Sequence, residues 1–153
     1  MWHLLTDEDR EVLKQADDII TRIFQTDHKF SEPAMVKRYL VSKNAVSETD
    51  REEFKVLYLN NQHGLITEET LFCGTVDASP VYPRVVVQQA LKYNAAAIIL
   101  SHNHPSGEPE PSRADRSITD RLKEALTLID VRILDHIIVG ANSTVSFAER
   151  GYL

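Results

Sequence analysis

The stretch Ala96-Ala97-Ile98-Ile99-Leu100-Ser101-His102-Asn103-His104-Pro105-Ser106-Gly107 joins an apolar run to a histidine pair and a Pro/Gly loop. The run from Ala96 to Leu100 is typical of a short buried strand, which would end at the histidines. Because alternate side chains of an extended segment point to the same face, His102 and His104 can place both rings together. Folding alone rarely requires this combination, so the stretch indicates chemistry at the end of a central strand.

A carboxylate further along the chain completes a possible metal site. Asp115 follows His104 by eleven residues, in the first turn of a helix that Ser112 would begin. Zinc accepts imidazole and carboxylate ligands, and a catalytic zinc site keeps three protein ligands and one open position. The same four residues from Ser112 to Asp115 also match a helix capping box, and capping does not exclude metal binding. We therefore predict that His102, His104 and Asp115 bind zinc.

A metal-activated water also needs a general base. Glu52 and Glu53, which precede the first expected strand, are the best placed carboxylates. The residue pattern by itself leaves both open.

The remaining patterns favour an α/β (α+β) fold, in which helices lie on a mixed sheet. A helix is expected from Thr6 to a polar break that begins at Gln25, and Thr6 with Asp9 should cap it. Further helices are expected over 33–44, over 83–94 and from Ser112 onward, and strands over 54–59, from 65 onward, and over 71–75, 96–100, 131–139 and 144–147. Because polar residues 42–50 precede the first strand, we expect an N-terminal helical arm over 1–45 and a metal-binding domain over 46–153.

Composition restricts the class of protein. The chain has 153 residues, enough for one hydrophobic core, and its single cysteine, Cys73, excludes an internal disulfide. The sequence shows neither a signal peptide nor an apolar run long enough for a membrane span, so we expect a cytoplasmic protein with no membrane association. A net charge of −6 argues against broad binding to nucleic acid.

The residues of the predicted metal site also resemble the motif of a known family. The order His-x-His, seven residues, Ser, two residues, Asp is similar to the JAMM (MPN+) metalloprotease motif. The fuller string from His102 to Gly107, followed by Pro111-Ser112 and Asp115, resembles the RadC family of bacterial JAMM-like proteins. Further matching strings are Tyr82–Arg84, Leu134–Gly140 and Ser146–Leu153. The resemblance covers about residues 50–153, and the chain looks like the short RadC-like proteins of prophages.

This resemblance implies a JAMM/MPN-like fold with cytidine-deaminase-like layering and a role for each site residue. His102, His104 and Asp115 would bind zinc, and Ser112 would stabilise an oxyanion. The family's general-base glutamate lies two residues before a strand phenylalanine. Phe54 matches that phenylalanine, which favours Glu52 and leaves Glu53 in reserve.

The implied activity is a zinc metallopeptidase that cleaves a peptide or isopeptide bond of an unknown protein or peptide substrate. The alternative is a DNA-repair-associated accessory protein whose metal site is structural or vestigial. The negative charge and the missing helix-hairpin-helix region of longer relatives argue against direct DNA binding.

Two further residues invite interpretation. His136 follows Asp135 on an expected buried strand, and it is either a core histidine paired with a neighbour or a support for a metal ligand. Cys73 lacks a catalytic signature nearby, so we expect a small core residue.

Overall fold

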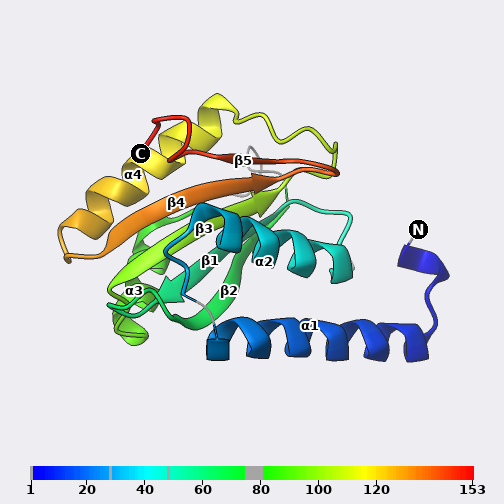
Figure 1. Ribbon diagram of the computed structural model, residues 1–153. Helices are drawn as coiled ribbons and strands as arrows, with labels where there is room; N and C mark the ends of the chain where they lie inside the picture. Colours follow the sequence, from blue (N-terminus) through cyan, green and yellow to red (C-terminus); the bar gives the residue numbers. More distant parts are fainter. Residues whose placement is uncertain (1, 28, 48, 75–80) are drawn as a thin grey trace.

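The computed structural model describes residues 2–27, 29–47, 49–74 and 81–153, and its centre is one mixed sheet (Figure 1). The five strands lie in the order β2-β1-β3-β4-β5. They are β1 (Glu53–Leu59), β2 (Leu65–Cys73), β3 (Ala97–Asn103), β4 (Arg132–Val139) and β5 (Thr144–Ser146). The helices are α1 (Asp7–Asp27), α2 (Pro33–Val46), α3 (Pro83–Lys92) and α4 (Arg113–Thr127), after a 3-10 turn η1 (Trp2–Leu4). The expected α+β class is confirmed.

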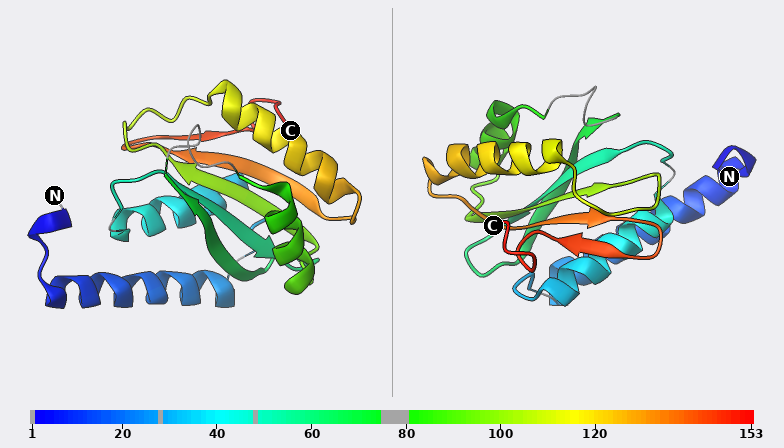
Figure 2. Two further views of the ribbon diagram at one scale, coloured as in Figure 1. Left: turned by 180° about the vertical axis from the view of Figure 1, so that it is seen from behind. Right: turned by 90° about the horizontal axis from the view of Figure 1, so that it is seen from above.

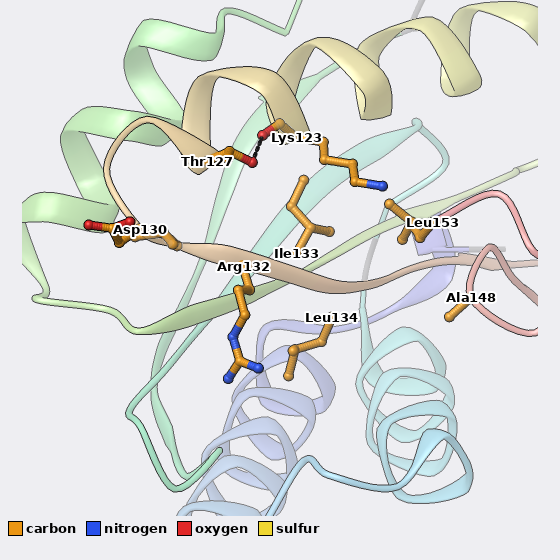
Figure 3. Close-up of a pocket in the computed structure, with 9 residues that line it drawn as sticks. Lys123, Thr127, Asp130, Arg132, Ile133, Leu134, Ala148 and Leu153 are labelled. Atoms are coloured by element: carbon orange, nitrogen blue, oxygen red, sulfur yellow. Dashed lines mark hydrogen bonds between the residues drawn. The ribbon is translucent and has the colours of Figure 1, made fainter.

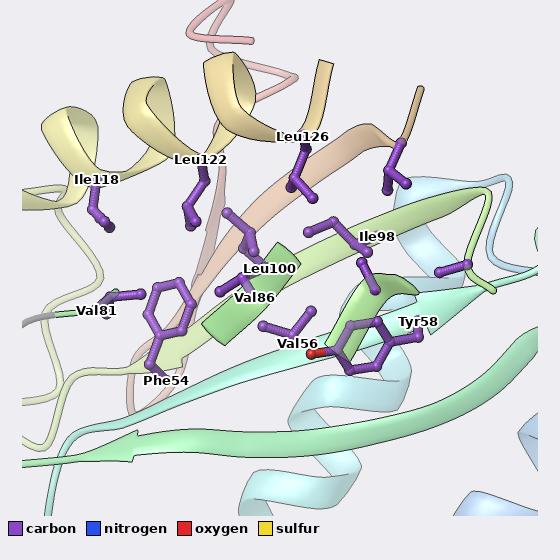
Figure 4. Packing of buried hydrophobic residues seen from close by; sticks show 13 residues of the cluster. Phe54, Val56, Tyr58, Val81, Val86, Ile98, Leu100, Ile118, Leu122 and Leu126 are labelled. Carbon is purple, nitrogen blue, oxygen red and sulfur yellow. The ribbon is translucent and has the colours of Figure 1, made fainter. Parts of the chain in front are cut away.

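Helices cover both faces of the sheet, as the two further views show (Figure 2). One face packs against α3 and α4, where Phe54, Val56 and Leu100 meet α4 residues such as Leu122 (Figure 4). The alternate residues of the same strands, among them Leu57, point to the other face and pack against α1 and α2. The period of two in a strand thus separates the two cores and assigns His102, which alternates with Leu100, to the α4 face.

The strand directions bring the ends of several strands to one edge of the sheet. β1 is antiparallel to β2 and to β3, whereas β3 and β4 are parallel. The start of β1 therefore lies beside the ends of β3 and β4, and in this register Phe54 is opposite His102. The helix α4 also begins at this edge, because it connects the parallel pair β3 and β4. Residues from β1, β3 and α4 can therefore meet there.

Several element boundaries differ from expectation. The two strands expected from 65 and over 71–75 are one strand, β2, because it pairs with β1 along its whole length; Thr75 lies outside the described residues. The polar break expected at Gln25 is helical up to Asp27. Gln25 is exposed and donates its side-chain N–H to the main-chain oxygen of Ile66, so its polarity does not oppose the helix.

The burial expected of Cys73 was wrong. Cys73 is exposed, because it ends the edge strand β2, which has few buried positions.

The N-terminal helices pack on the sheet rather than apart from it. Val36 and Tyr39 of α2 are buried in the second core. The ammonium of Lys43 lies 2.6 Å from Asp17 of α1 and 2.8 Å from Glu68 of β2. The division into an arm over 1–45 and a domain over 46–153 stays a prediction. Within the described parts of the chain, no helix is both long and apolar enough to cross a bilayer.

Candidate metal centre

Four side chains converge at the edge where β1, β3 and α4 meet. The Nε2 atoms of His102 and His104 are 2.9 Å apart, and Oδ1 of Asp115 lies 3.2 Å from Nε2 of His102. Oε1 of Glu52 lies 3.8 Å from Nε2 of His102 and 3.9 Å from Nε2 of His104. One ligand atom from each residue falls within a group no wider than 4.8 Å. These four residues could hold a metal ion.

The loop after β3 fixes the orientation of His104. Its main-chain N–H donates to the oxygen of Val139 at 2.9 Å, which fastens the loop to the end of β4. Its Nδ1 lies 2.7 Å from the main-chain oxygen of Glu108. Because a carbonyl only accepts, Nδ1 carries the proton, and a neutral ring then leaves Nε2 with a free lone pair. His104 is therefore prepared to bind a cation through Nε2.

Two glycines allow this loop to lie against the turn between β4 and β5. A Cβ atom at Gly140 would lie 2.4 Å from the oxygen of Gly107 and 2.9 Å from Cδ of Pro109. Gly107 has a φ of 90°, in the left-handed region that favours glycine, and its oxygen accepts from the N–H of Ala141. The loop that contains Gly107 can therefore approach the backbone of the β4–β5 turn closely.

Asp115 divides its two carboxylate oxygens between capping and the candidate metal position. Oδ2 accepts hydrogen bonds from the main-chain N–H and the hydroxyl of Ser112, and the N–H of Asp115 donates to the same hydroxyl. Oδ1 faces His102. Burial alone would raise the pKa of this carboxyl, but His102 and the hydrogen bonds from Ser112 hold the pKa below its usual value. The capping box and the metal-site geometry therefore coexist.

The two candidate bases occupy different surroundings. Glu52 reaches the histidines, whereas the carboxylate of Glu53 lies 3.1 Å from the ammonium of Lys55. Asn103, between the two histidines, holds this segment, since its side chain accepts from the N–H of Glu53 and donates to the oxygen of Arg51. The structure brings together Glu52, not Glu53, with the predicted ligands.

His136 is a core histidine and also contacts a predicted metal ligand, so both interpretations that the sequence left open apply. The ring is fully buried, as expected of a core histidine. Its Nε2 lies 2.8 Å from Nδ1 of His102, and its Nδ1 lies 2.7 Å from Oγ1 of Thr119. Burial, and after it the charge of His102, lowers the pKa of His136 well below its usual value.

Sequence reasoning missed two residues around the site: Thr119, which bonds to His136, and Asn103, which holds the segment of Glu52. Both carried a signal. Thr119 follows Asp115 by four residues and so lies on the same helix face, and Asn103 separates the histidines. Helix and strand periodicity could have singled them out, although neither periodicity identifies their partners.

Two of the four side chains are accessible to solvent. The side chains of His104 and Glu52 are each 16% exposed, whereas those of His102 and Asp115 are nearly inaccessible. A groove of about 320 Å³ adjoins His104, and its wall is mostly polar or small, with Trp2, Asn44, Ser47, Thr49, Asp50, Asn103, Pro105, Gly107, Gly140 and Ala141. Of the four converging residues, only His104 lines this groove.

A second pocket, of about 580 Å³, lies elsewhere (Figure 3). It is formed by the start of β4, the end of α4 and the C-terminal tail, and it includes Lys123, Arg132 and Leu153. None of the four converging residues lines it.

The sequence is similar to proteins of one family over most of its length. A family model described as a RadC-like JAB domain matches residues 30–152. A UPF0758 protein of Vibrio cholerae is 52% identical over 145 residues, which cover 95% of this chain and 90% of the relative. A UPF0758 protein of Idiomarina loihiensis is 56% identical over 124 residues, or 81% of this chain. That alignment spans only 54% of the relative, so the chain corresponds to about half of the longer protein.

Proposed function

Because the chain belongs to the RadC-like JAB domain family, we propose that it is a zinc-dependent hydrolase of the JAMM type. The bond cleaved would be a peptide or isopeptide bond, with a protein or peptide as substrate. The observation that carries the proposal is the convergence of two imidazole nitrogens and one carboxylate oxygen, with a second carboxylate less than 4 Å from both nitrogens.

The donor set suits zinc. His102, His104 and Asp115 would supply two nitrogens and one oxygen, the mixed set of catalytic zinc sites with three protein ligands. The two imidazole nitrogens, 2.9 Å apart, need either a shared proton or a shared cation between them, and a zinc ion would replace the proton. When bound, zinc would act as a Lewis acid on a carbonyl oxygen and make water acidic enough to react at neutral pH.

Glu52 would carry the proton. Oε1 takes one proton from the attacking water, whose oxygen forms a bond to the carbonyl carbon of the substrate. When the carbon–nitrogen bond breaks, the same oxygen returns the proton to the leaving nitrogen. The 16% exposure of Glu52, equal to that of His104, supports this role, because a reactant can reach the carboxylate.

Ser112 has two proposed roles. Its hydrogen bonds orient Asp115. The family resemblance adds donation from its hydroxyl to the developing oxyanion, for which the hydroxyl would turn its single proton away from Asp115.

A matched pair of adjacent substitutions tests the proposal. Glu52→Gln removes the proton acceptor and keeps the side-chain shape, so we expect roughly 100-fold or greater loss of hydrolysis with zinc retained. Glu53→Gln changes a neighbouring carboxylate that pairs with Lys55 and should leave turnover within about threefold. Substrates would first be sought by trapping peptides from a proteome on zinc-loaded Glu52→Gln protein, and then assayed by mass spectrometry with the wild type.

Metal binding is tested separately. His104→Ala should abolish stoichiometric zinc, measured by elemental analysis after dialysis, whereas His63→Asn should retain it. His63 lies in a turn at positive φ, which Asn tolerates. Wild-type protein that retains no zinc, or Glu52→Gln protein that hydrolyses a trapped peptide at the wild-type rate, would overturn the proposal.

A further inference from the structure

A buried series of hydrogen bonds links His102, the proposed ligand on β3, to α4, the helix that carries the proposed ligand Asp115. It runs from Nδ1 of His102 to Nε2 of His136 at 2.8 Å, and from Nδ1 of His136 to Oγ1 of Thr119 at 2.7 Å. It ends where Oγ1 of Thr119 meets the main-chain oxygen of Asp115 at 2.6 Å. His102, His136 and Thr119 are at most 1% exposed, so bulk water does not compete for these groups.

The direction of each of these hydrogen bonds follows from the one between Thr119 and Asp115. The main-chain oxygen of Asp115 can only accept, so the hydroxyl of Thr119 must donate its single proton to it. Oγ1 of Thr119 can then only accept from His136, which places a proton on Nδ1 of that ring. In a neutral His136 the other nitrogen, Nε2, has a lone pair and accepts from Nδ1 of His102.

The surroundings of His136 favour the neutral ring in one orientation. Its ring centroid lies 4.6 Å from that of Phe147 and 5.7 Å from that of Phe54. These aromatic contacts stabilise the ring against rotation, and complete burial disfavours a second proton.

We propose that His136 and Thr119 are positioning residues that hold the proton of His102 on Nδ1 and thereby reserve its Nε2 for the metal. Were His136 to donate from Nε2 instead, His102 would have to accept at Nδ1, and its own proton would occupy Nε2. The inference rests on the proposed function only in taking Nε2 of His102 as a metal ligand. His104 also carries its proton on Nδ1 and leaves Nε2 for the metal, but there the acceptor is the main-chain oxygen of Glu108.

The proton positions can be measured without metal or substrate. In metal-free protein with ¹⁵N-labelled histidine, NMR should show a proton on Nδ1 of His102, and a proton on Nδ1 but not on Nε2 of His136. A proton on Nε2 of His136, or an unprotonated Nδ1 of His102, would overturn the inference. This measurement needs no variant, so it does not depend on the folding of one.

A second measurement links these protons to metal affinity. Thr119→Val keeps the shape of the side chain but removes the acceptor for His136, whereas Thr119→Ser keeps the hydroxyl. We expect the zinc Kd, measured by competition with a chelator, to rise roughly 10- to 100-fold in Thr119→Val and to stay within about threefold in Thr119→Ser. In Thr119→Val, the proton on Nδ1 of His102 should also be lost or shared.

Equal zinc affinity in both variants would overturn the link to the metal. A wild-type protein that has the expected protons on both histidines but binds no zinc would contradict the proposed function. It would also contradict the role of these hydrogen bonds in holding a metal ligand. Wild-type zinc binding with the opposite protons would contradict the positioning role alone. Failure of the two proposals can therefore be told apart.

Discussion

Ser112 donates two hydrogen bonds to a single oxygen of Asp115, from its main-chain N–H at 2.7 Å and from its hydroxyl at 2.8 Å. The other carboxylate oxygen is left to face His102. One contact therefore starts α4 and orients a candidate metal ligand.

Ser112→Ala should consequently have two effects. Loss of the cap should lower the free energy of unfolding by about 1 kcal/mol. Loss of the hydroxyl donor should loosen Asp115 and raise the zinc Kd roughly 10-fold or more. Chemical denaturation and chelator competition would measure the two effects.

Helix α1 offers the control for this variant. Thr6 and Asp9 form the same reciprocal capping box there, with a hydroxyl-to-carboxylate distance of 2.6 Å. Thr6→Ala should cost a similar free energy of unfolding and leave the zinc Kd unchanged. Weaker zinc binding in both variants would indicate a general loss of stability and contradict a specific role for Ser112.

Gly140→Ala should disturb the histidine loop. The new methyl group would overlap the oxygen of Gly107, so we expect a loss of about 1–3 kcal/mol in unfolding free energy together with weaker zinc binding. Gly151→Ala provides a comparison, because its positive φ makes it strained but no atom lies within 4 Å of the added Cβ. It should lower stability without changing the zinc Kd. Normal zinc affinity in Gly140→Ala would mean that the loop can shift without moving His104.

Lys43 should contribute far more to stability than Lys37 on the same helix. The Lys43 side chain is 5% exposed and contacts both Asp17 and Glu68, so Lys43→Ala would leave partly buried carboxylates without their cation. We expect a loss of about 3 kcal/mol, since breaking a buried ion pair from one side is costly. Lys37 pairs with the exposed Glu149, and Lys37→Ala should cost less than about 1 kcal/mol. Equal losses in urea denaturation would contradict this difference.

The stability of the metal-free protein should depend on Asp115 at acid pH. Because the pKa of Asp115 is held below its usual value of 3.8, the unfolded chain binds a proton at pH values where the folded carboxyl does not. The stabilisation is complete above about pH 5, begins to decline near pH 4, and is lost progressively as the pH falls on toward the folded pKa, with a slope of at most about 1.4 kcal/mol per pH unit. Denaturation of wild type and Asp115→Asn between pH 5.5 and 3.5 should give a flatter curve for the variant. Parallel curves would show that the folded carboxyl titrates normally.

Local sequence signals predicted much of the fold. The boundaries of α2, β1 and β4 agree with the expected segments within two residues. The single strand β2 was harder, because its burial alternates poorly and only its pairing with β1 gives it continuity. Cys73 was misplaced for the same reason, since an edge position is set by strand order and not by local hydrophobicity.

For the candidate site, the sequence by itself determined the donor set. His102, His104, Asp115 and Ser112 lie within fourteen consecutive residues, and strand alternation and helix capping dictate their local geometry. The residue pattern left Glu52 and Glu53 open and the resemblance favoured Glu52; the tertiary structure brings Glu52 to the others, because β1 reaches β3 through a register in which Phe54 lies opposite His102. Likewise, His136 meets His102 only because β3 and β4 pair in parallel, and Thr119 meets His136 only because α4 packs across that pair. Such long-range contacts depend on how the strands are ordered and packed, which local periodicity does not encode.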